Sequence, residues 1–218
     1  MSVKASVVVV TYRRLERIPE ILTAWLAQTP DVWLCDCSLH GVKVVPPGTK
    51  IARFRPDPGN KVRHAVSLLT QGDIVIKADD DILPLPGLVD DFVKWHAKLG
   101  PCITGIHGRT FCGPDYYRDT TMHAGHMIKE PMKVDFVGII TCASRRFLPM
   151  DLRDCGTEIE DLYWHNHCYP KAPKYVIPTK AYNNNLPESR DAGRLCADKP
   201  GRMVRRAFYT KCWMENYR

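Results

Sequence analysis

Apolar runs and an amphipathic segment alternate in the N-terminal part of the chain. Residues 4–10 form a β-branched run, which predicts a strand that is buried on both faces. Residues 15–26 carry apolar side chains three or four positions apart and end before Thr29 and Pro30, which predicts an amphipathic helix. Residues 32–35 form a second apolar run. Strand, helix and strand in this order predict a βαβ unit.

The alternation continues to about residue 100. We predict short strands within 42–56, a helix at 60–71, a buried strand at 73–77 and a helix at 86–100. The buried strand leads directly into Asp79, Asp80 and Asp81. The three aspartates are therefore expected at the carboxyl end of a central strand, which is the edge where open α/β sheets bind ligands.

The pattern beyond residue 101 is less regular. It predicts strands at 102–106, 132–137 and 139–142, with a loop rich in Tyr, His and Thr at 112–127. A helix at 158–167, a last strand at 175–177 and an exposed loop at 183–193 follow. No repeat and no long linker interrupts the chain. We therefore expect a single α/β domain over residues 1–193, with a nucleotide-binding half at about 1–100, an acceptor half at about 101–193, and a C-terminal tail at 194–218.

Composition narrows the class of protein. The chain has 218 residues, 44% of them apolar and 25% charged, which is enough for a core and excludes a disordered, collagenous or coiled-coil protein. Its nine cysteines are an odd number spread over a chain of this size, which favours reduced thiols over a disulfide framework. With no apolar run near the ~18 residues of a membrane span and no secretory signal, we expect a soluble cytoplasmic protein.

Histidine and cysteine pairs raise the possibility of a zinc site. The ligand-like pairs are Cys35-x-Cys37, His123-x-x-His126 and His165-x-His167-Cys168. None has the paired CxxC spacing of a structural zinc site. Buried thiols and ordinary histidines are therefore the preferred interpretation.

The three consecutive aspartates are the most informative feature. Adjacent carboxylates repel one another, and a divalent cation relieves that repulsion. Because alternate residues of an extended chain point the same way, Asp79 and Asp81 are expected to share one face. The motif therefore predicts Mg²⁺ or Mn²⁺ held by these two aspartates, with Asp80 on ribose or on the metal's surroundings. The alternative is a solvated acidic loop that caps the following helix.

Motifs in a fixed order connect the aspartates to a known family. They are Thr11-Tyr12-Arg13-Arg14, Asp36-Cys37-Ser38, Gly59-Asn60-Lys61 ahead of Gly72-Asp73, Asp79 to Asp81, and Glu160-Asp161. In this order and spacing, about residues 3 to 170 resemble the GT-A class of nucleotide-sugar glycosyltransferases, particularly the large family-two group. The chain departs from the family pattern at Arg13, where Asn is common, and at Asp36, which stands without a second acid. The resemblance implies a GT-A fold with a Rossmann-like mixed central sheet flanked by helices.

The resemblance also implies a donor site. A nucleotide sugar, most commonly a UDP-sugar, would be held by Thr11, Tyr12, Arg13, Asp36, Ser38, Asn60, Lys61, Asp79 and Asp80. Arg190 and Arg194 are further candidates for phosphate contacts, and solvated surface charge is the alternative for each of these cations. Asp36 can accept a hydrogen bond from the base, although capping a turn is equally in character for an aspartate.

An acceptor hydroxyl must lose a proton as it attacks the sugar, which requires a base within hydrogen-bond reach. The resemblance makes Asp161 the first candidate and Glu160 the second. The alternative is that both acids only favour the dipole of a helix N-terminus. His165 lies one helical turn beyond Asp161, where it is a candidate metal or phosphate ligand, with a satisfied pocket histidine as the preferred interpretation.

The acceptor itself is indicated only by charge. The chain carries a net charge of +7, and residues 194–218 hold +5 of it, interleaved with aromatic residues. This composition suits nucleic acid or anionic membrane headgroups, while a helix that packs its aromatics on the domain is the simpler interpretation. Our hypothesis is a sugar transferred to a hydroxymethylpyrimidine in DNA, as some bacteriophage enzymes do, which would place the protein in the host cytoplasm.

Other assignments stay open at this point. A saccharide, lipid or protein hydroxyl is the competing acceptor. A nucleotidyltransferase also uses an α/β fold with acidic metal ligands, but it would release pyrophosphate. A non-catalytic nucleic-acid-binding protein would account for the basic tail and leave the aspartates unexplained.

Overall fold

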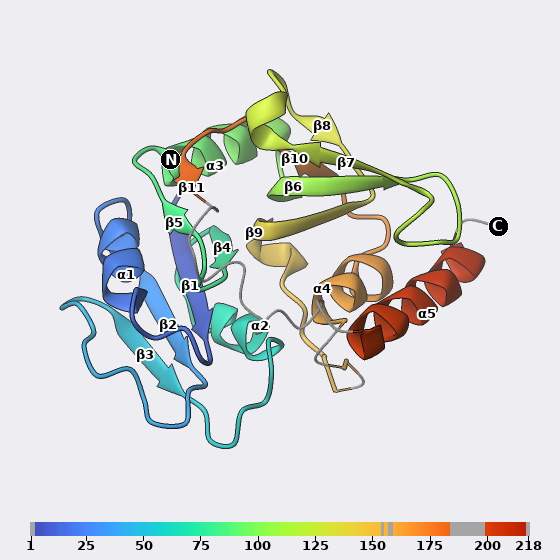
Figure 1. Cartoon of the computed structure of the whole chain (residues 1–218). Coiled ribbons are helices and arrows are strands. Elements are labelled where there is room, and N and C mark those ends of the chain that lie inside the picture. Colours follow the sequence, from blue (N-terminus) through green and yellow to red (C-terminus); the bar gives the residue numbers. More distant parts are fainter. Residues whose placement is uncertain (1–2, 154, 157–158, 184–198, 217–218) are drawn as a thin grey trace.

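Parallel strands form the first half of the central sheet in the computed structural model, which describes residues 3–153, 155–156, 159–183 and 199–216. These strands are β1 (Ala5–Thr11), β2 (Val32–Asp36), β3 (Lys50–Arg53) and β4 (Ile74–Ala78), in the order β3-β2-β1-β4 (Figure 1). In β1, Val7 and Val9 pack into one apolar cluster and Val8 and Val10 into another. The predicted strand is thus confirmed, and its β-branched run is apolar throughout because both faces are covered.

The second half of the sheet is mainly antiparallel. Its strands are β6 (Ile103–Phe111), β7 (Thr120–Ala124), β8 (Met132–Lys133), β9 (Phe136–Ser144) and β10 (Lys174–Val176). Strand β9 joins the halves, because it pairs antiparallel with both β4 and β6. Two short strands, β5 (Leu83–Pro84) and β11 (Tyr182–Asn183), form a separate pair. The mixed α/β sheet that the sequence predicts is confirmed.

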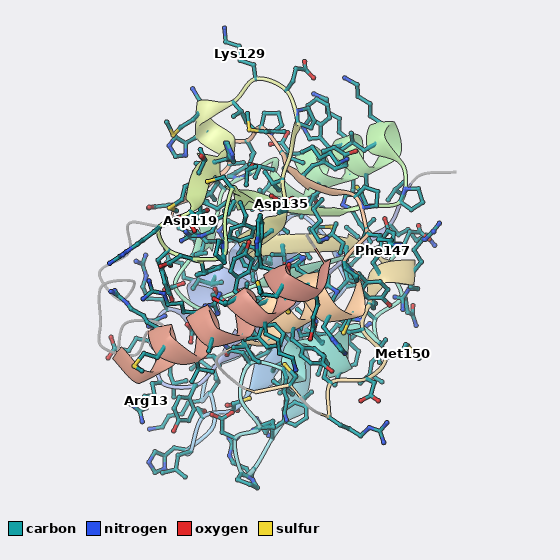
Figure 2. The ribbon with its side chains drawn as sticks, turned by 90° about the vertical axis from the view of Figure 1, so that its right-hand side faces the viewer. Arg13, Asp119, Lys129, Asp135, Phe147 and Met150 are labelled. Carbon is teal, nitrogen blue, oxygen red and sulfur yellow. The ribbon has the colours of Figure 1, made fainter. Side chains whose placement is uncertain are left out.

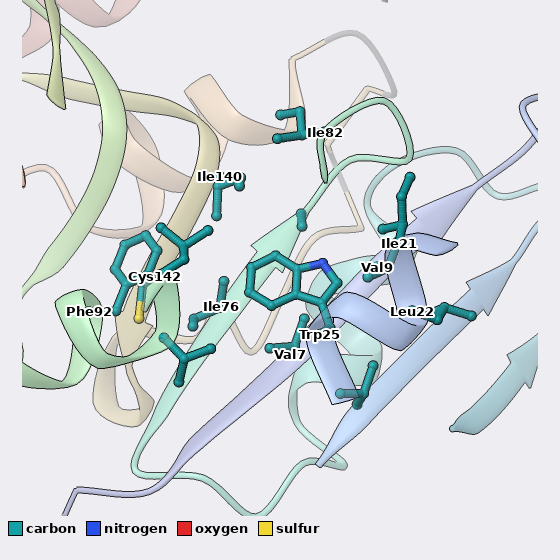
Figure 3. Packing of buried hydrophobic residues seen from close by; sticks show 14 of the residues in the cluster. Val7, Val9, Ile21, Leu22, Trp25, Ile76, Ile82, Phe92, Ile140 and Cys142 are labelled. Carbon is teal, nitrogen blue, oxygen red and sulfur yellow. The ribbon is translucent and has the colours of Figure 1, made fainter. Parts of the chain in front are cut away.

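Helices cover both faces of the sheet. They are α1 (Ile18–Leu26), α2 (Val62–Ser67), α3 (Leu88–Leu99), α4 (Glu160–Tyr163) and α5 (Lys199–Asn216). Trp25 of α1 and Phe92 of α3 belong to the cluster on one face, where Figure 3 shows Trp25 beside Val7 and Ile76. Val62 of α2 belongs to the cluster on the other face. The layers follow from the amphipathic spacing of each helix.

The structure differs from the sequence prediction at several elements. The strand predicted at 132–137 is divided between β8 and β9, and the strand predicted at 139–142 is a continuation of β9. Strand β7 lies in the segment predicted as a loop. It lacks the alternation of buried apolar and exposed polar residues that identifies a half-buried strand, because its consecutive residues Thr121 and Met122 are both exposed. Its hairpin is closed by Asp119, whose side chain accepts a hydrogen bond from the amide of Asp115 at 3.0 Å. Helix α2 ends at Ser67, and α4 passes at Trp164 into a π-helical turn (Trp164–Cys168).

The basic C-terminal segment contains α5, which packs on the domain through one face. Tyr209 and Cys212 are buried, and Tyr209 lies in a cluster with Phe111 and Leu162. The opposite face exposes Met203 and Lys211, among others. No helix among the described residues is long and apolar enough to cross a membrane. The predicted loop beyond residue 183 and residues 194–198 of the tail lie outside the described residues.

Acid is expected to destabilise the fold through His96 of α3. Its ring nitrogens lie 2.9 Å from Thr104 Oγ1 and 3.2 Å from Ser144 Oγ. Burial lowers the pKa of His96 to about 4, against about 6.5 for an unfolded chain. Between these values the unfolded chain binds a proton that the folded chain does not, so the free energy of unfolding falls as pH falls below 6.5, by about 2–3 kcal/mol at pH 4.5.

Urea unfolding at pH 7.5 and 4.5 tests this expectation. His96→Gln should reduce the loss of stability between the two pH values, and the exposed control His40→Gln should leave it unchanged. Part of the slope should remain, because burial also lowers the pKa of His107 to about 4. Equal acid losses in the wild type and in His96→Gln would contradict the assignment.

Candidate active site

A cavity of about 60 Å³ lies where α2, β9 and α4 meet the carboxyl end of β4. Its lining residues come from α2, β9, α4, the residue after β4 and the turn after α4: Arg63, His64, Asp79, Gly138, Ile139, Thr141, Asp161 and Trp164. Asp79 and Asp161, two of the carboxylates singled out in the sequence, therefore line one cavity although they belong to different halves of the chain. Its place at the strand end is the one that the α/β pattern predicts.

The end of β1 and the turn after it contact Asp79 to Asp81, the acidic loop, through Thr11 and Arg14. The Thr11 hydroxyl donates to Asp80 Oδ2 at 2.8 Å, and Arg14 Nη1 lies 3.2 Å from Asp80 Oδ1 and 2.9 Å from Asp81 Oδ2. Burial raises the pKa of Asp80 to about 6, against the opposing effects of Thr11 and Arg14. Arg13, the residue chosen from the sequence, is exposed and lies 4.9 Å from the centre of the Tyr12 ring. The structure thus brings the neighbouring arginine to the aspartates.

Arg63 of α2 connects the acidic loop to the Glu160-Asp161 pair. Its guanidinium donates to Asp79 Oδ1 at 2.7 Å and also forms an ion pair with Glu160 Oε1. Glu160 is 3% exposed; burial raises the pKa of its carboxyl, and Arg63 opposes that rise. The sequence reasoning missed Arg63. The available signal was a cation among the apolar positions of a buried helix, beside Val62.

Asp161 presents a carboxylate to the cavity. Its Oδ1 accepts hydrogen bonds from the amide of Leu162 at 2.8 Å and from Arg205 Nη1 at 2.9 Å, and its Oδ2 accepts one from Arg205 Nη2 at 3.0 Å. Burial raises the pKa of Asp161, but the charge and hydrogen bonds of Arg205 outweigh it and hold this pKa below its usual value. Because Glu160 does not line the cavity, Asp161 is the better placed of the two acids.

A buried lysine lies behind the wall of the cavity. Lys77 Nζ is 2.9 Å from the centre of a Trp164 ring and 3.3 Å from His64 Nδ1. Burial lowers the pKa of both Lys77 and His64. Sequence reasoning placed Lys77 in a buried strand without assigning it a role, and the structure shows that it packs against two of the lining side chains.

Strand β9 reaches the cavity through an irregular segment. The register between β6 and β9 shifts between Gly105 and His107, and Ile139 adopts a φ of 68° at the facing position. A positive φ is unusual for a β-branched residue and costs of order 1–3 kcal/mol. Strain of this kind at a lining residue accords with a functional site, where packing rather than local preference sets the backbone.

His165 is the histidine that the sequence makes a candidate metal ligand with Asp79 and Asp81. Its ring is fully buried and lies edge-on to Phe136, with the ring centroids 5.0 Å apart. Among the described residues, no three His, Cys, Asp or Glu side chains form a group that could hold a metal ion. The structure thus does not bring His165 together with Asp79 and Asp81 into a three-ligand site.

The carboxylate of Asp36 accepts hydrogen bonds from the turn that follows it. Its Oδ1 accepts hydrogen bonds from the amide and hydroxyl of Ser38 at 3.1 and 2.5 Å, and its Oδ2 accepts one from the amide of Val42 at 3.1 Å. Arg55 adds an ion pair at 3.5 Å. Burial raises the pKa of Asp36, but these hydrogen bonds lower it below its usual value. This geometry corresponds to the turn-capping alternative; a base contact would have to use remaining lone pairs.

The other predicted donor contacts are less defined. Asn60 and Lys61 stand half-buried at the start of α2, near Arg63, and their role at the donor stays a prediction. Arg190 and Arg194 lie outside the described residues. The described site therefore consists of Asp79 and Asp161 at the cavity, with arginines that join them to neighbouring elements.

Comparison with known proteins supports the fold. No family model matches the sequence, and no curated protein matches it. The crystal structure of residues 1–349 of S. aureus TarS superposes with a TM-score of 0.57 and 17% identity, covering 82% of this chain and 59% of that one. The same fragment in complex with UDP-GlcNAc superposes with a TM-score of 0.55 and 18% identity, covering 82% of this chain and 57% of that one. In complex with UDP, the TM-score is 0.57 and the identity 18%, covering 82% of this chain and 59% of that one. The chain thus has the predicted GT-A fold and spans less than two thirds of that fragment.

Proposed function

We propose that this protein is a glycosyltransferase that moves a sugar from a nucleotide-sugar donor to an acceptor hydroxyl, with Asp161 as the general base. The observation that carries the proposal is the shared cavity, which Asp79 of the acidic loop and the Asp161 carboxylate both line. A carboxylate within hydrogen-bond reach of a hydroxyl can take its proton as the new bond forms. The acidic loop lies at the strand edge where nucleotide ligands bind in this class of fold.

The proposed donor is a UDP-sugar carrying a hexose. Supporting this choice, the TarS fragment of the same fold has been crystallised with UDP-GlcNAc and with UDP. Sugar transfer leaves negative charge on the departing diphosphate, which preorganised cations stabilise. Arg14 and Arg63 are cations of this chain that already contact the acidic loop.

A divalent cation fits the donor chemistry of the loop. Asp79 and Asp81 offer carboxylate oxygens, the hard ligands that Mg²⁺ and Mn²⁺ prefer, and Mg²⁺ sites often combine one or two carboxylates with substrate phosphates. The Asp79 side chain is 37% exposed at the cavity. A bound Mg²⁺ or Mn²⁺ would act as a Lewis acid on the diphosphate. Arg63 and Arg14 orient the two carboxylates through the ion pairs described above.

Nucleotide binding is the first test of the proposal. UDP should raise the midpoint of thermal unfolding, because a ligand at 100 times its Kd stabilises the folded state by about 2.7 kcal/mol. The shift should grow when Mn²⁺ is added. Asp81→Asn should remove the Mn²⁺-dependent part, and the exposed control Asp90→Asn should retain it. No shift with any nucleoside diphosphate, with or without Mn²⁺, would contradict the proposed function.

The acceptor part of the proposal is a hydroxymethylpyrimidine in DNA. It rests on the +5 charge of residues 194–218, of which Arg202 and Lys211 are exposed on α5. Arg205 and Arg206 contribute less to such a surface, because they form ion pairs with acids of the domain. Exposed cations suit phosphate contacts, which make binding strongly dependent on salt.

Transfer of label from UDP-[¹⁴C]glucose and UDP-[¹⁴C]GlcNAc in the presence of Mn²⁺ tests the acceptor. Duplex DNA with hydroxymethylcytosine should become labelled, and the same duplex with cytosine should not. Label in an oligosaccharide, lipid or protein instead would replace the DNA acceptor and keep the enzyme class. Release of pyrophosphate from a nucleoside triphosphate, without sugar transfer, would identify a nucleotidyltransferase.

A further inference from the structure

The C-terminal helix supplies a charged partner to the proposed base. Arg205 of α5 is 6% exposed, and its two terminal nitrogens donate separately to the two oxygens of Asp161 at 2.9 and 3.0 Å. Its Nη2 also lies 3.2 Å from the hydroxyl of Tyr116, and its guanidinium carbon lies 5.4 Å from the centre of that ring. A bidentate pair of this kind fixes the plane of the carboxylate as well as its position.

Further contacts fix the helix itself in place. The Tyr209 ring is fully buried, with its centroid 4.3 Å from that of Phe111. Thr210 donates a hydrogen bond to the carbonyl of Pro114 at 3.0 Å, and Arg206 forms an ion pair with Asp115. Figure 2 shows α5 crossing this side of the molecule in front of the shorter helical segment that contains α4. Arg205 therefore projects from a helix that is anchored by the residues directly following it.

The hydrogen bonds distinguish the two oxygens of Asp161. Within the described part of the chain, Oδ1 accepts two hydrogen bonds, from Leu162 and Arg205, whereas Oδ2 accepts one, from Arg205. A carboxylate oxygen has two lone pairs, so Oδ2 keeps capacity for one more hydrogen bond. Since Asp161 lines the cavity, a hydroxyl bound there can donate to this oxygen.

We propose that Arg205 is a positioning residue that directs Oδ2 of Asp161 at the acceptor hydroxyl; this role rests on the glycosyltransferase function proposed above. The hydroxyl proton passes to Oδ2 as the acceptor oxygen bonds to the anomeric carbon. The bond from that carbon to the diphosphate breaks, and its electron pair leaves with the diphosphate. Arg205 stays protonated throughout. The C-terminal helix thus contributes Arg205 to the catalytic site.

Lysine and arginine are not equivalent in this role. An ammonium group keeps the charge next to Asp161 but cannot hold both oxygens in the geometry of a guanidinium. Arg205→Lys therefore separates orientation from charge, whereas Arg205→Gln removes both. Because misplacement of a reacting group by about 1 Å can cost about 100-fold in rate, orientation alone is a measurable contribution.

The test measures turnover of UDP-GlcNAc and UDP-glucose, with water and with the acceptors named above, in the wild type and in Arg205→Lys, Arg205→Gln and Arg206→Gln. Arg205→Lys should lower kcat about 10- to 100-fold with KM for the donor within about twofold. Arg205→Gln should also move the acid limb of the pH–kcat profile to higher pH, because the pKa of Asp161 rises when its cation is removed. Arg206→Gln breaks the neighbouring ion pair of the same helix. Because the Arg206 side chain is half exposed, this pair adds little to the anchoring by Tyr209 and Thr210, and the variant should retain the wild-type kcat and profile.

Several outcomes would overturn this role. If Arg205→Lys keeps kcat within twofold of the wild type, or if Arg205→Gln leaves the acid limb in place, Arg205 only anchors the helix. An increase in kcat would show that Arg205 blocks the base. Should Arg205→Gln fail to fold, Arg205→Lys still decides between these outcomes. A wild type that turns over neither donor contradicts the proposed function itself, whereas an active wild type with an unaffected Arg205→Lys contradicts only the positioning role.

Discussion

Asp161→Asn is expected to lower kcat for sugar transfer by about 10²- to 10⁴-fold, the range associated with general acid–base catalysis. The substitution preserves the size of the side chain, and its amide oxygen can still accept a hydrogen bond from Arg205. The amide cannot take a proton from the acceptor hydroxyl. Because Asp161 lines the cavity but makes no contact with the acidic loop among the hydrogen bonds and ion pairs of the described residues, donor binding should remain close to that of the wild type.

Steady-state kinetics with UDP-GlcNAc or UDP-glucose measure the loss, and the thermal shift with UDP and Mn²⁺ measures donor binding. Asp151→Asn is the control, because this exposed aspartate pairs with Arg153 and does not line the cavity. A kcat above about one third of the wild-type value would remove Asp161 from the chemistry. Normal turnover in Asp161→Asn together with a large loss in Glu160→Gln would transfer the base to Glu160.

The sequence predicts the central sheet well for a physical reason. A strand buried on both faces must be apolar at every position, so the run from Val7 to Val10 is visible without any knowledge of its neighbours. The edge strand β7 gives no such signal, because among the described strands it pairs with β6 alone, and its Thr121 and Met122 are exposed. Pattern reasoning therefore identifies the strands of the first half of the chain more accurately than those of the irregular second half.

Only the acidic residues of the candidate site could be predicted from the sequence. Asp79 is marked by the strand before it, and Asp161 by the family resemblance. The sequence does not show which arginine pairs with which acid, because Arg63 lies 97 residues from Glu160 and Arg205 lies 44 residues from Asp161. Only the packing of α2 and α5 brings these charges together.

The sequence also could not show which of two adjacent arginines contacts the acidic loop. Arg13 and Arg14 have the same chemistry, and a turn has no periodicity that would say which one faces the acidic loop. The structure brings Arg14 to Asp80 and Asp81. Likewise, the sequence alone could not decide between a ligand and a turn cap for Asp36, because both roles use the same oxygens, and the amides of Ser38 and Val42 now account for much of its hydrogen bonding.

Arg63→Met should destabilise the folded state by about 3–5 kcal/mol, because it leaves a buried carboxylate without its cation. Arg63 is 9% exposed and Glu160 3% exposed. Methionine fills much of the volume of the arginine stem, so loss of charge rather than loss of packing dominates. Asp79 loses the same partner at smaller cost, because its side chain is 37% exposed. Equilibrium urea unfolding at pH 7 measures the loss.

The pH dependence of this loss distinguishes charge from packing. Without Arg63, burial should raise the pKa of Glu160 further above the value of about 4.3 in an unfolded chain. The folded variant then binds a proton that the unfolded chain releases, so its free energy of unfolding falls as pH rises above 4.3. Relative to the wild type, Arg63→Met should therefore be more destabilised at pH 7 than at pH 4.5, whereas a packing defect would cost the same at both.

The double variant Arg63→Met with Glu160→Gln removes the carboxylate charge that Arg63→Met alone leaves buried. It should recover at least half of the stability lost by Arg63→Met, as expected when both partners of a buried pair become neutral. Lys98→Gln is the control for an exposed pair: Lys98 and Glu130 lie 3.6 Å apart at the surface, and breaking that contact should change stability by no more than about 0.5 kcal/mol. If the double variant is as unstable as Arg63→Met alone, Glu160 does not cause the loss, and Arg63 supports the fold through its contacts with the acidic loop instead.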